Sequence, residues 1–158
     1  MSKKQPEYVK QLLAQNKKAT HDYFIEEKFE TGIVLKGTEV KSLRDGRASI
    51  NEAHANHMEG EIFLLGSNIP EYKKAHQFNH HPRRPRKLLL KKREIKKMIG
   101  LLQKKGYTLI PLSLYFNNKN LVKVSLGLAK GKKKYDKRES IKQRDWDRKK
   151  ARILKNTE

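Results

Sequence analysis

The chain has no cysteine, which excludes disulfide bonds and metal sites built from thiolates. It also lacks long apolar runs. The first 18 residues contain no stretch of signal-peptide type, and no segment approaches the roughly 20 apolar residues that cross a bilayer. We therefore expect a soluble cytoplasmic protein with no membrane contact. A length of 158 residues suits a single domain.

Acidic residues are scarce in the second half of the chain. Residues 17–72 hold 7 basic and 10 acidic side chains, whereas residues 73–97 hold 11 basic and one acidic. Residues 98–129 contain four cations and no acid, and the last 29 residues hold 13 basic and 5 acidic side chains. A net charge of +21 that is segregated in this way indicates RNA or DNA as the partner. The alternative is a solvated surface that is merely highly charged.

Hydrophobic periodicity predicts many short strands and one well-formed helix. A β-like pattern runs over residues 21–37, and the amphipathic helix is expected over residues 86–106, ended by Gly106. Thr38 is the expected N-cap of a short helix over residues 38–46. Residues 67–85 read as a long loop. The remaining strands are expected at 48–50, 53–58, 61–65, 107–116 and 121–129.

These elements predict a mainly β fold, a small closed or nearly closed β-barrel with α-helices attached. Residues 1–16 are expected to be a flexible N-terminal arm with a helical turn around Val9–Leu13. Residues 17–129 form the barrel domain. Residues 130–158 form a basic C-terminal tail that buries too little apolar surface to fold alone.

Cations gather in the loop and in the helix that follows it. Arg93 and Lys96 stand on adjacent helical turns and can follow a phosphate backbone. The alternative is the solvated face of an amphipathic helix. The candidate nucleic-acid contacts in this region are Arg83, Arg84, Arg86, Lys87, Lys91, Lys92, Arg93, Lys96 and Lys97.

His21 and Tyr23 alternate along the expected strand and would share one face of it. Exposed rings of this kind stack on unpaired bases. The alternative is a buried tyrosine beside an incidental histidine. Sequence alone leaves the two open.

Clustered carboxylates at Glu26, Glu27 and Glu30, with His21, suggest a rival reading as a metal-dependent RNA-processing enzyme. The spacing matches no familiar ligand set, and no nucleotide-binding loop or nucleophile motif is present. We expect no metal, no cofactor and no catalytic residue. A general RNA-binding or ribosome-associated protein is a further alternative.

The tail has more order in its sequence than a plain basic extension. Gly127 and Gly131 bracket an expected departure from the last strand, and Lys132, Lys133 and Lys134 offer phosphate contacts. Trp146 and Ile153 lie seven residues apart, on one face of a helix that would form against a polyanion.

Four segments of the chain, in order, resemble bacterial small protein B, the tmRNA-binding (SsrA-binding) protein family. They are HDYFIEEKFETGIVLKGTEVKSLRDGRASI, RPRKLLLKKREI, LIPLSLYF and GLAKGKKKYDKRESIKQRDW. The similarity extends from about Lys17 to Asn156 and includes the tail.

The resemblance implies an OB-like barrel and an adaptor role in trans-translation, without enzyme activity. The adaptor, a monomer, would bind the tRNA-like domain of tmRNA and enter stalled ribosomes with elongation factor Tu and GTP. Its tail, disordered until then, would fold in the empty mRNA channel beside the decoding centre of the small subunit.

The resemblance also assigns roles to residues. Glu30 and Leu89 match tmRNA-binding positions, while Lys91 departs from the usual Asn or His. Lysine cannot accept a hydrogen bond, but an added cation suits RNA. The expected tmRNA-binding set is Glu30, Lys41, Arg44, Arg86, Leu89, Lys91, Lys92 and Arg93. The expected decoding-centre set is His21, Tyr23 and Tyr135. The expected tail set is Gly131, Lys132, Lys133, Lys134, Asp136, Lys137, Arg138, Trp146 and Ile153.

Overall fold

Seven antiparallel strands and four helices make up the fold in the computed structural model, which describes residues 9–75, 77–132 and 134–156. The strands are β1 (Val9–Gln15), β2 (Tyr23–Ile33), β3 (His54–Met58), β4 (Glu61–Leu65), β5 (Arg86–Leu89), β6 (Tyr107–Asn117) and β7 (Val122–Gly131). The helices are α1 (Ala19–Asp22), α2 (Gly37–Arg44), α3 (Lys92–Leu102) and α4 (Lys134–Asn156).

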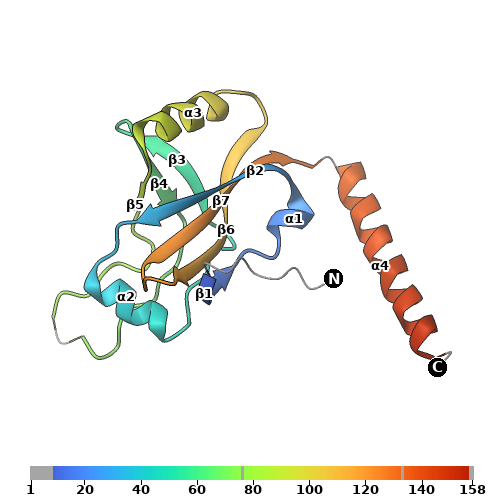
Figure 1. Ribbon diagram of the computed structural model, residues 1–158, viewed down its shortest axis with the longest axis horizontal. Coiled ribbons are helices and arrows are strands. Elements are labelled where there is room, and N and C mark those ends of the chain that lie inside the picture. Colours follow the sequence, from blue (N-terminus) through green and yellow to red (C-terminus); the bar gives the residue numbers. More distant parts are fainter. Residues whose placement is uncertain (1–8, 76, 133, 157–158) are drawn as a thin grey trace.

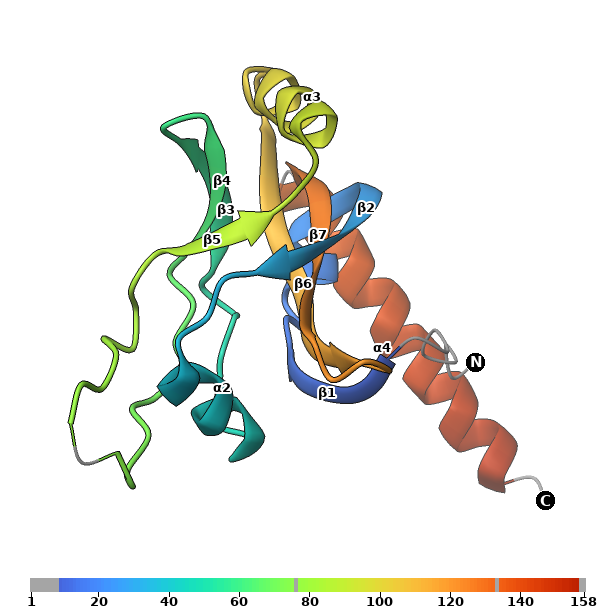
Figure 2. The ribbon, with the colours of Figure 1, turned by 60° about the vertical axis from the view of Figure 1, so that its left-hand side comes forward.

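The sheet closes on itself. Its strand order is β1-β6-β3-β4-β5-β2-β7, and β7 also pairs with β6, so six strands form a barrel with β1 added on β6. Figure 1 shows α3 at one end of this barrel and α2 at the other, with α4 projecting from the side. The view in Figure 2 keeps α2 and α3 at opposite ends. The predicted small closed barrel with flanking helices is confirmed.

Alternation along β2 separates the core from the surface. Thr31 and Ile33 are buried, whereas Lys28 and Glu30 are exposed. Leucines, isoleucines and valines from the other strands complete the core, and α3 covers one end of it with Ile95 and Met98. The burial of this apolar surface supplies the main driving force for the fold.

Three local predictions for the part of the chain before β3 are wrong. The helical turn expected at Val9–Leu13 is strand β1, which pairs with β6, so the expected flexible arm is part of the sheet from Val9 onward. Residues 1–8 of that arm lie outside the described residues. The expected N-cap Thr38 is the second residue of α2, and the N-cap position is occupied by Lys36. The strand expected at residues 48–50 is a single bridge between Ser49 and Asn68.

The helix expected over residues 86–106 begins only at Lys92. Arg86–Leu89 is β5 instead, and Leu88 is fully buried opposite Ile33 of β2. Pairing with two strands outweighs the local helical pattern of this segment. The last strand also runs further than expected, because Gly127 lies inside β7 and Gly131 ends it.

The tail forms α4 over residues Lys134–Asn156. Its apolar side chains Ile141, Trp146, Ile153 and Leu154 are exposed rather than packed on the barrel. The expected disorder of this tail before ribosome binding is therefore not confirmed and stays a prediction. In the described part of the chain, no helix combines the length and apolar character needed to cross a membrane.

Candidate nucleic-acid interface

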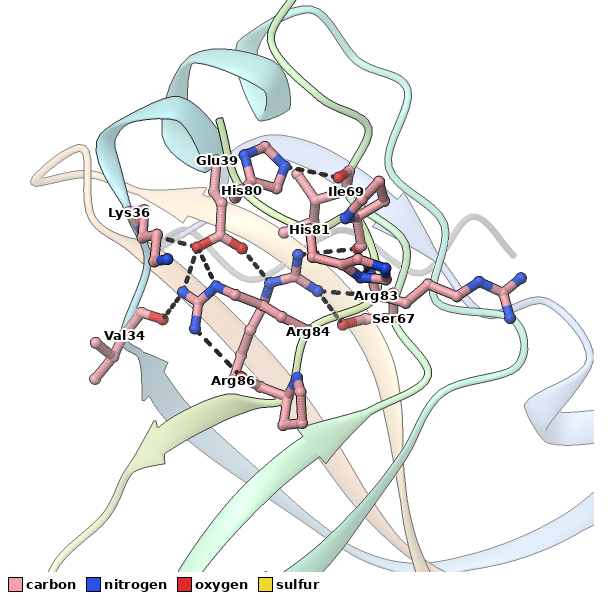
Figure 3. A network of polar contacts seen from close by, with 12 residues as sticks. Val34, Lys36, Glu39, Ser67, Ile69, His80, His81, Arg83, Arg84 and Arg86 are labelled. Carbon is pink, nitrogen blue, oxygen red and sulfur yellow. Dashed lines mark hydrogen bonds and ion pairs between the residues drawn. The ribbon is translucent and has the colours of Figure 1, made fainter. Parts of the chain in front are cut away.

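A buried carboxylate, Glu39 of α2, organises one end of the barrel (Figure 3). Its Oε2 accepts a hydrogen bond from Arg86 Nε, and its Oε1 accepts hydrogen bonds from Arg84 Nε at 3.0 Å and from Arg84 Nη2. The backbone N–H of Lys36 donates to the same Oε1 at 2.8 Å. The side chains of Glu39 and Arg86 are both completely buried, so the pair is shielded from solvent screening.

Opposing effects act on the charges of this network. Burial raises the pKa of Glu39, but hydrogen bonds from Arg84, from the Lys36 N–H and from Arg86 outweigh it and hold that pKa below its ordinary value. Burial lowers the pKa of Arg86, and Glu39 opposes the change. The carboxylate is therefore ionised at neutral pH and fixes the positions of two arginines.

The same network holds the long loop of residues 67–85. Arg86 Nη1 donates to Ser67 Oγ at 2.9 Å, and its Nη2 donates to the carbonyl of Pro82 at 3.0 Å. Buried His80 lies 2.9 Å from Thr38 Oγ1 and 2.8 Å from the carbonyl oxygen of Ile69. Because both ends of the loop are bound to α2 and β5, the loop has a defined path.

Arg86 is therefore not the RNA contact that the sequence suggested. Its side chain is fully buried, and its guanidinium is occupied by Glu39, Ser67 and Pro82. We assign it a positioning role instead. Arg84 is half-buried on the same carboxylate, whereas Arg83 is exposed and forms a loose ion pair with Glu52 at 3.7 Å.

Glu30 and Leu89 lie on one exposed face of the barrel. We call Glu30, Leu89 and the nearby exposed Lys91 the β2–β5 surface. Gly32 pairs with Leu89 across β2 and β5, and Glu30 points to the same side as Gly32 because it is two residues away. A Cβ atom on Gly32 would lie 3.1 Å from Leu89 Cβ. The absence of that atom lets Leu89 lie over β2 while remaining 53% exposed.

Cations of α3 continue this surface. Lys91 is the N-cap of α3, and Lys92 and Arg93 follow it as exposed residues in the first turn. Lys97 already has partners within the protein. Its Nζ forms an ion pair with Glu27 at 2.8 Å and lies 5.5 Å from the ring centroid of Phe29. Among the described residues, Arg93 makes no such ion pair.

Lys41 and Arg44 do not join that group. Both are exposed on α2, at the opposite end of the barrel from α3 (Figures 1 and 2). Lys41 Nζ lies 5.7 Å from the ring centroid of Tyr72 in the long loop. The expected tmRNA-binding residues are therefore divided between the β2–β5 surface with α3 and the end formed by α2 and the loop.

A second site lies where the tail leaves the barrel. Tyr23 pairs with Gly131, and the Lys132 N–H donates to the carbonyl of Asp22 at 3.0 Å. Lys132 Nζ donates to the carbonyl of Thr20 at 2.9 Å. We call Thr20, His21, Asp22, Tyr23, Gly131 and Lys132 the tail root.

His21 is part of this tail root, but not as expected. It lies in α1 rather than on β2, so it does not share a strand face with Tyr23. Its Nδ1 lies 2.8 Å from Asp22 Oδ1, and the ring is half-buried. The structure therefore brings His21 and Tyr23 close to Gly131 and Lys132 through α1 and the end of β7.

The other expected tail residues that the structure describes belong to α4. Trp146 is 53% exposed, with Lys150 Nζ 5.5 Å from its ring, and Ile153 is 63% exposed. Lys134, Tyr135, Asp136, Lys137 and Arg138 occupy the first turns of the helix. The side chains of the first four, and the whole of Lys133, lie outside the described part of the chain.

Three of the residues suggested as metal ligands, Glu26, Glu27 and His21, have separate partners. Glu26 accepts a hydrogen bond from the Tyr107 hydroxyl at 3.1 Å, which raises the pKa of Tyr107. Glu27 pairs with Lys97, and His21 contacts Asp22. Across residues 9–75, 77–132 and 134–156, no group of three or more His, Asp or Glu is arranged to hold a metal ion.

Sequence reasoning missed the Glu39–Arg84–Arg86 network. A signal was present, because Arg84 and Arg86 flank Pro85 at a spacing that puts both side chains on one side of an extended chain. It also missed the anchoring of Lys132 on α1, for which the sequence offers no local signal.

Together these features define a small basic β-barrel with a polar network at one end and a helical basic extension at its side. The SmpB protein family matches residues 13–156, and the chain belongs to that family. The resemblance stated from the sequence is confirmed.

Relatives agree with this assignment over nearly the whole chain. The SsrA-binding protein of Rickettsia conorii is 61% identical over 146 residues, which cover 92% of this chain and 96% of the relative. The SsrA-binding protein of Rickettsia bellii is 60% identical over 92% of this chain and 97% of its own. A solved structure described as "tmRNA-SmpB: a journey to the center of the bacterial ribosome" is 45% identical, with a TM-score of 0.65 over 80% of this chain and 92% of that chain.

Proposed function

We propose that this protein is the tmRNA-binding adaptor of trans-translation. It binds the tRNA-like domain of tmRNA and brings it to stalled ribosomes, where the tail reads the empty mRNA channel. The observation that carries the proposal is the 61% identity to SsrA-binding proteins over 92% of the chain. The solved relative with tmRNA and the ribosome in its description supports the same partners.

The barrel and the tail divide the work. The β2–β5 surface and the exposed cations of α3 contact tmRNA, with Lys91, Lys92 and Arg93 on phosphates and Leu89 as an apolar contact. The tail root and α4 contact the ribosome. The separation of the two sites on the molecule supports this division (Figure 1). With tmRNA bound to the β2–β5 surface and α3, the tail root and α4 stay accessible to the ribosome.

The adaptor acts as a cytoplasmic monomer and is delivered with elongation factor Tu and GTP. It has no catalytic role of its own. The rival enzyme is tested by incubating the protein with structured RNA and Mg²⁺ or Mn²⁺, with Glu30→Gln as the control variant. Cleavage by the wild type that is lost in Glu30→Gln would contradict the adaptor function and support a nuclease.

A competition experiment tests tmRNA selectivity. The labelled tRNA-like domain is bound at fixed salt and displaced by unlabelled tmRNA or by bulk tRNA. We expect tmRNA to displace it at far lower concentration, since specific contacts add to the phosphate contacts that every RNA offers. Equal displacement by the two RNAs would leave only a general RNA-binding protein.

A further inference from the structure

Phe78, near the tip of the long loop, is exposed to an unusual degree. The residue is 93% accessible, the highest value among the large exposed apolar residues of the described chain. Its backbone has φ of +56°, a region that bulky residues rarely adopt. The other non-glycine residues described with positive φ, Glu59 and Asn120, lie in tight turns between paired strands. Phe78 lies in no such turn.

Hydrogen bonds anchor the chain on the C-terminal side of Phe78. Asn79 Oδ1 accepts from the Tyr72 N–H at 3.2 Å, and its Nδ2 donates to the Tyr72 carbonyl at 2.9 Å. The next residue, His80, is 1% exposed and lies within hydrogen-bond distance of Thr38 and Ile69. The exposed Phe78 therefore directly precedes a segment that is anchored to α2 through His80 and Thr38.

The charge around this frame favours RNA as the partner of the ring. Lys73 and Lys74 are exposed and lie in the chain between Tyr72 and Asn79, which are hydrogen-bonded to each other. Lys41 lies over Tyr72, and Arg83 is exposed further along the loop. Exposed aromatic rings set among cations are typical of sites where an unpaired base stacks while its phosphates meet the cations.

We propose that Phe78 stacks on an unpaired base of the tRNA-like domain of tmRNA, with Lys73 and Lys74 on the adjoining phosphates. The loop forms one end of the barrel with α2, whereas α4 leaves from the side (Figures 1 and 2). This end therefore lies on the barrel, opposite α3 and apart from the tail, and it carries Lys41 and Arg44 of the expected tmRNA-binding set. The inference rests on the proposed function and adds a second contact region to it.

Binding of the full-length protein to the tRNA-like domain tests the inference. Phe78→Asn removes the ring while keeping a residue that tolerates positive φ, so it separates stacking from backbone strain. We expect binding about tenfold weaker, with an unchanged salt slope because no charge is lost. Phe78→Trp should bind at least as tightly as the wild type. Lys73→Gln should lower the salt slope.

Leu121→Ala is the matched control, since Leu121 is an exposed apolar residue in the turn between β6 and β7. It should bind as the wild type does. In the F78W/W146F double variant, the introduced indole should lose fluorescence on binding. Wild-type affinity of Phe78→Asn, or an unquenched indole in the bound complex, would overturn the inference. Failure of the wild type to prefer tmRNA would instead overturn the proposed function.

Discussion

Arg86 Nε donates a hydrogen bond to Glu39 Oε2 in the interior of the protein, and this contact joins β5 to α2. The remaining N–H groups of Arg86 reach Ser67 and Pro82, at the two ends of the long loop. One ion pair thus fixes a strand, a helix and a loop relative to one another. The loop that carries Phe78 depends on it.

Replacing the buried carboxylate should cost more stability than a surface substitution. Glu39→Gln leaves the buried charge of Arg86 without a counter-ion, and we expect the free energy of unfolding to fall by about 3–5 kcal/mol. Urea denaturation followed by circular dichroism measures it. Glu61→Gln, which breaks the partly exposed pair with Lys87, is the control and should cost about 1 kcal/mol or less.

The stability due to Glu39 should also depend on pH. Because its pKa in the folded protein is lowered, this contribution is fully present above the ordinary carboxyl pKa of about 4.3 and is lost as pH falls through the lowered value. The difference in unfolding free energy between the wild type and Glu39→Gln should therefore be constant from pH 7 to 5 and shrink below that. A difference that grew towards acid would contradict the lowered pKa.

Arg86→Lys keeps the charge but loses the planar fork that serves four acceptor atoms on three residues. Each buried acceptor left unsatisfied costs about 1–3 kcal/mol. We expect faster hydrogen exchange in residues 67–85, with β6 and β7 unchanged. Uniform acceleration throughout the barrel would show a general loss of stability instead.

Gly32→Ala tests the contact that positions Leu89. The added Cβ atom would meet Leu89 Cβ at 3.1 Å, so Leu89 and β5 must shift. We expect a loss of about 1–3 kcal/mol in stability and weaker tmRNA binding at a temperature where the protein stays folded. Gly100→Ala on exposed α3, where nothing lies within 4 Å, should leave affinity unchanged. Equal affinities for all three proteins would remove Leu89 from the interface.

Salt dependence should distinguish the cations of α3. Arg93→Gln should lower the log–log salt slope of tmRNA binding by roughly 0.7–0.9, the value for one phosphate contact. Lys97→Gln should lower it less, because Glu27 already neutralises that ammonium group at 2.8 Å. Slopes measured by filter binding over a salt series decide. A larger drop for Lys97→Gln would place the RNA on the other side of α3.

The sequence predicted the barrel well because alternation and turn residues are local signals. The strands that flank Glu59 and Gly60, and the pair β6 and β7, follow directly from them. The beginning of α3 could not be predicted in this way. Residues Arg86–Leu89 fit a helical pattern locally and become a strand only because β4 and β2 pair with them.

The site was also predicted only in part, because it depends on contacts between residues that are distant in the sequence. Cation density is visible in a sequence, but burial is not, so Arg86 and Arg93 looked equivalent although one is interior and the other exposed. The tail root depends on Lys132 reaching the carbonyls of Thr20 and Asp22, more than 100 residues earlier in the chain. No periodicity or spacing reports such a contact.

Within the tail, the Asp136→Ala/Lys137→Ala double variant should bind tmRNA normally and fail to support peptide tagging. Tagging is measured on ribosomes stalled on truncated messages, with the wild type as reference. Ala151→Ser, on exposed α4, serves as the control and should tag normally. Normal tagging by the double variant would exclude these two residues from the mechanism.

The division of labour between barrel and tail is tested most directly by a chain that ends at Lys132, which retains the hydrogen bonds of Lys132 to Thr20 and Asp22. Its affinity for the tRNA-like domain and its tagging activity are measured side by side with those of the full chain. We predict nearly unchanged affinity, because α4 lies apart from the tmRNA-facing surface, together with loss of tagging (Figure 1). Loss of tmRNA binding, or tagging at the level of the full chain, would contradict the account.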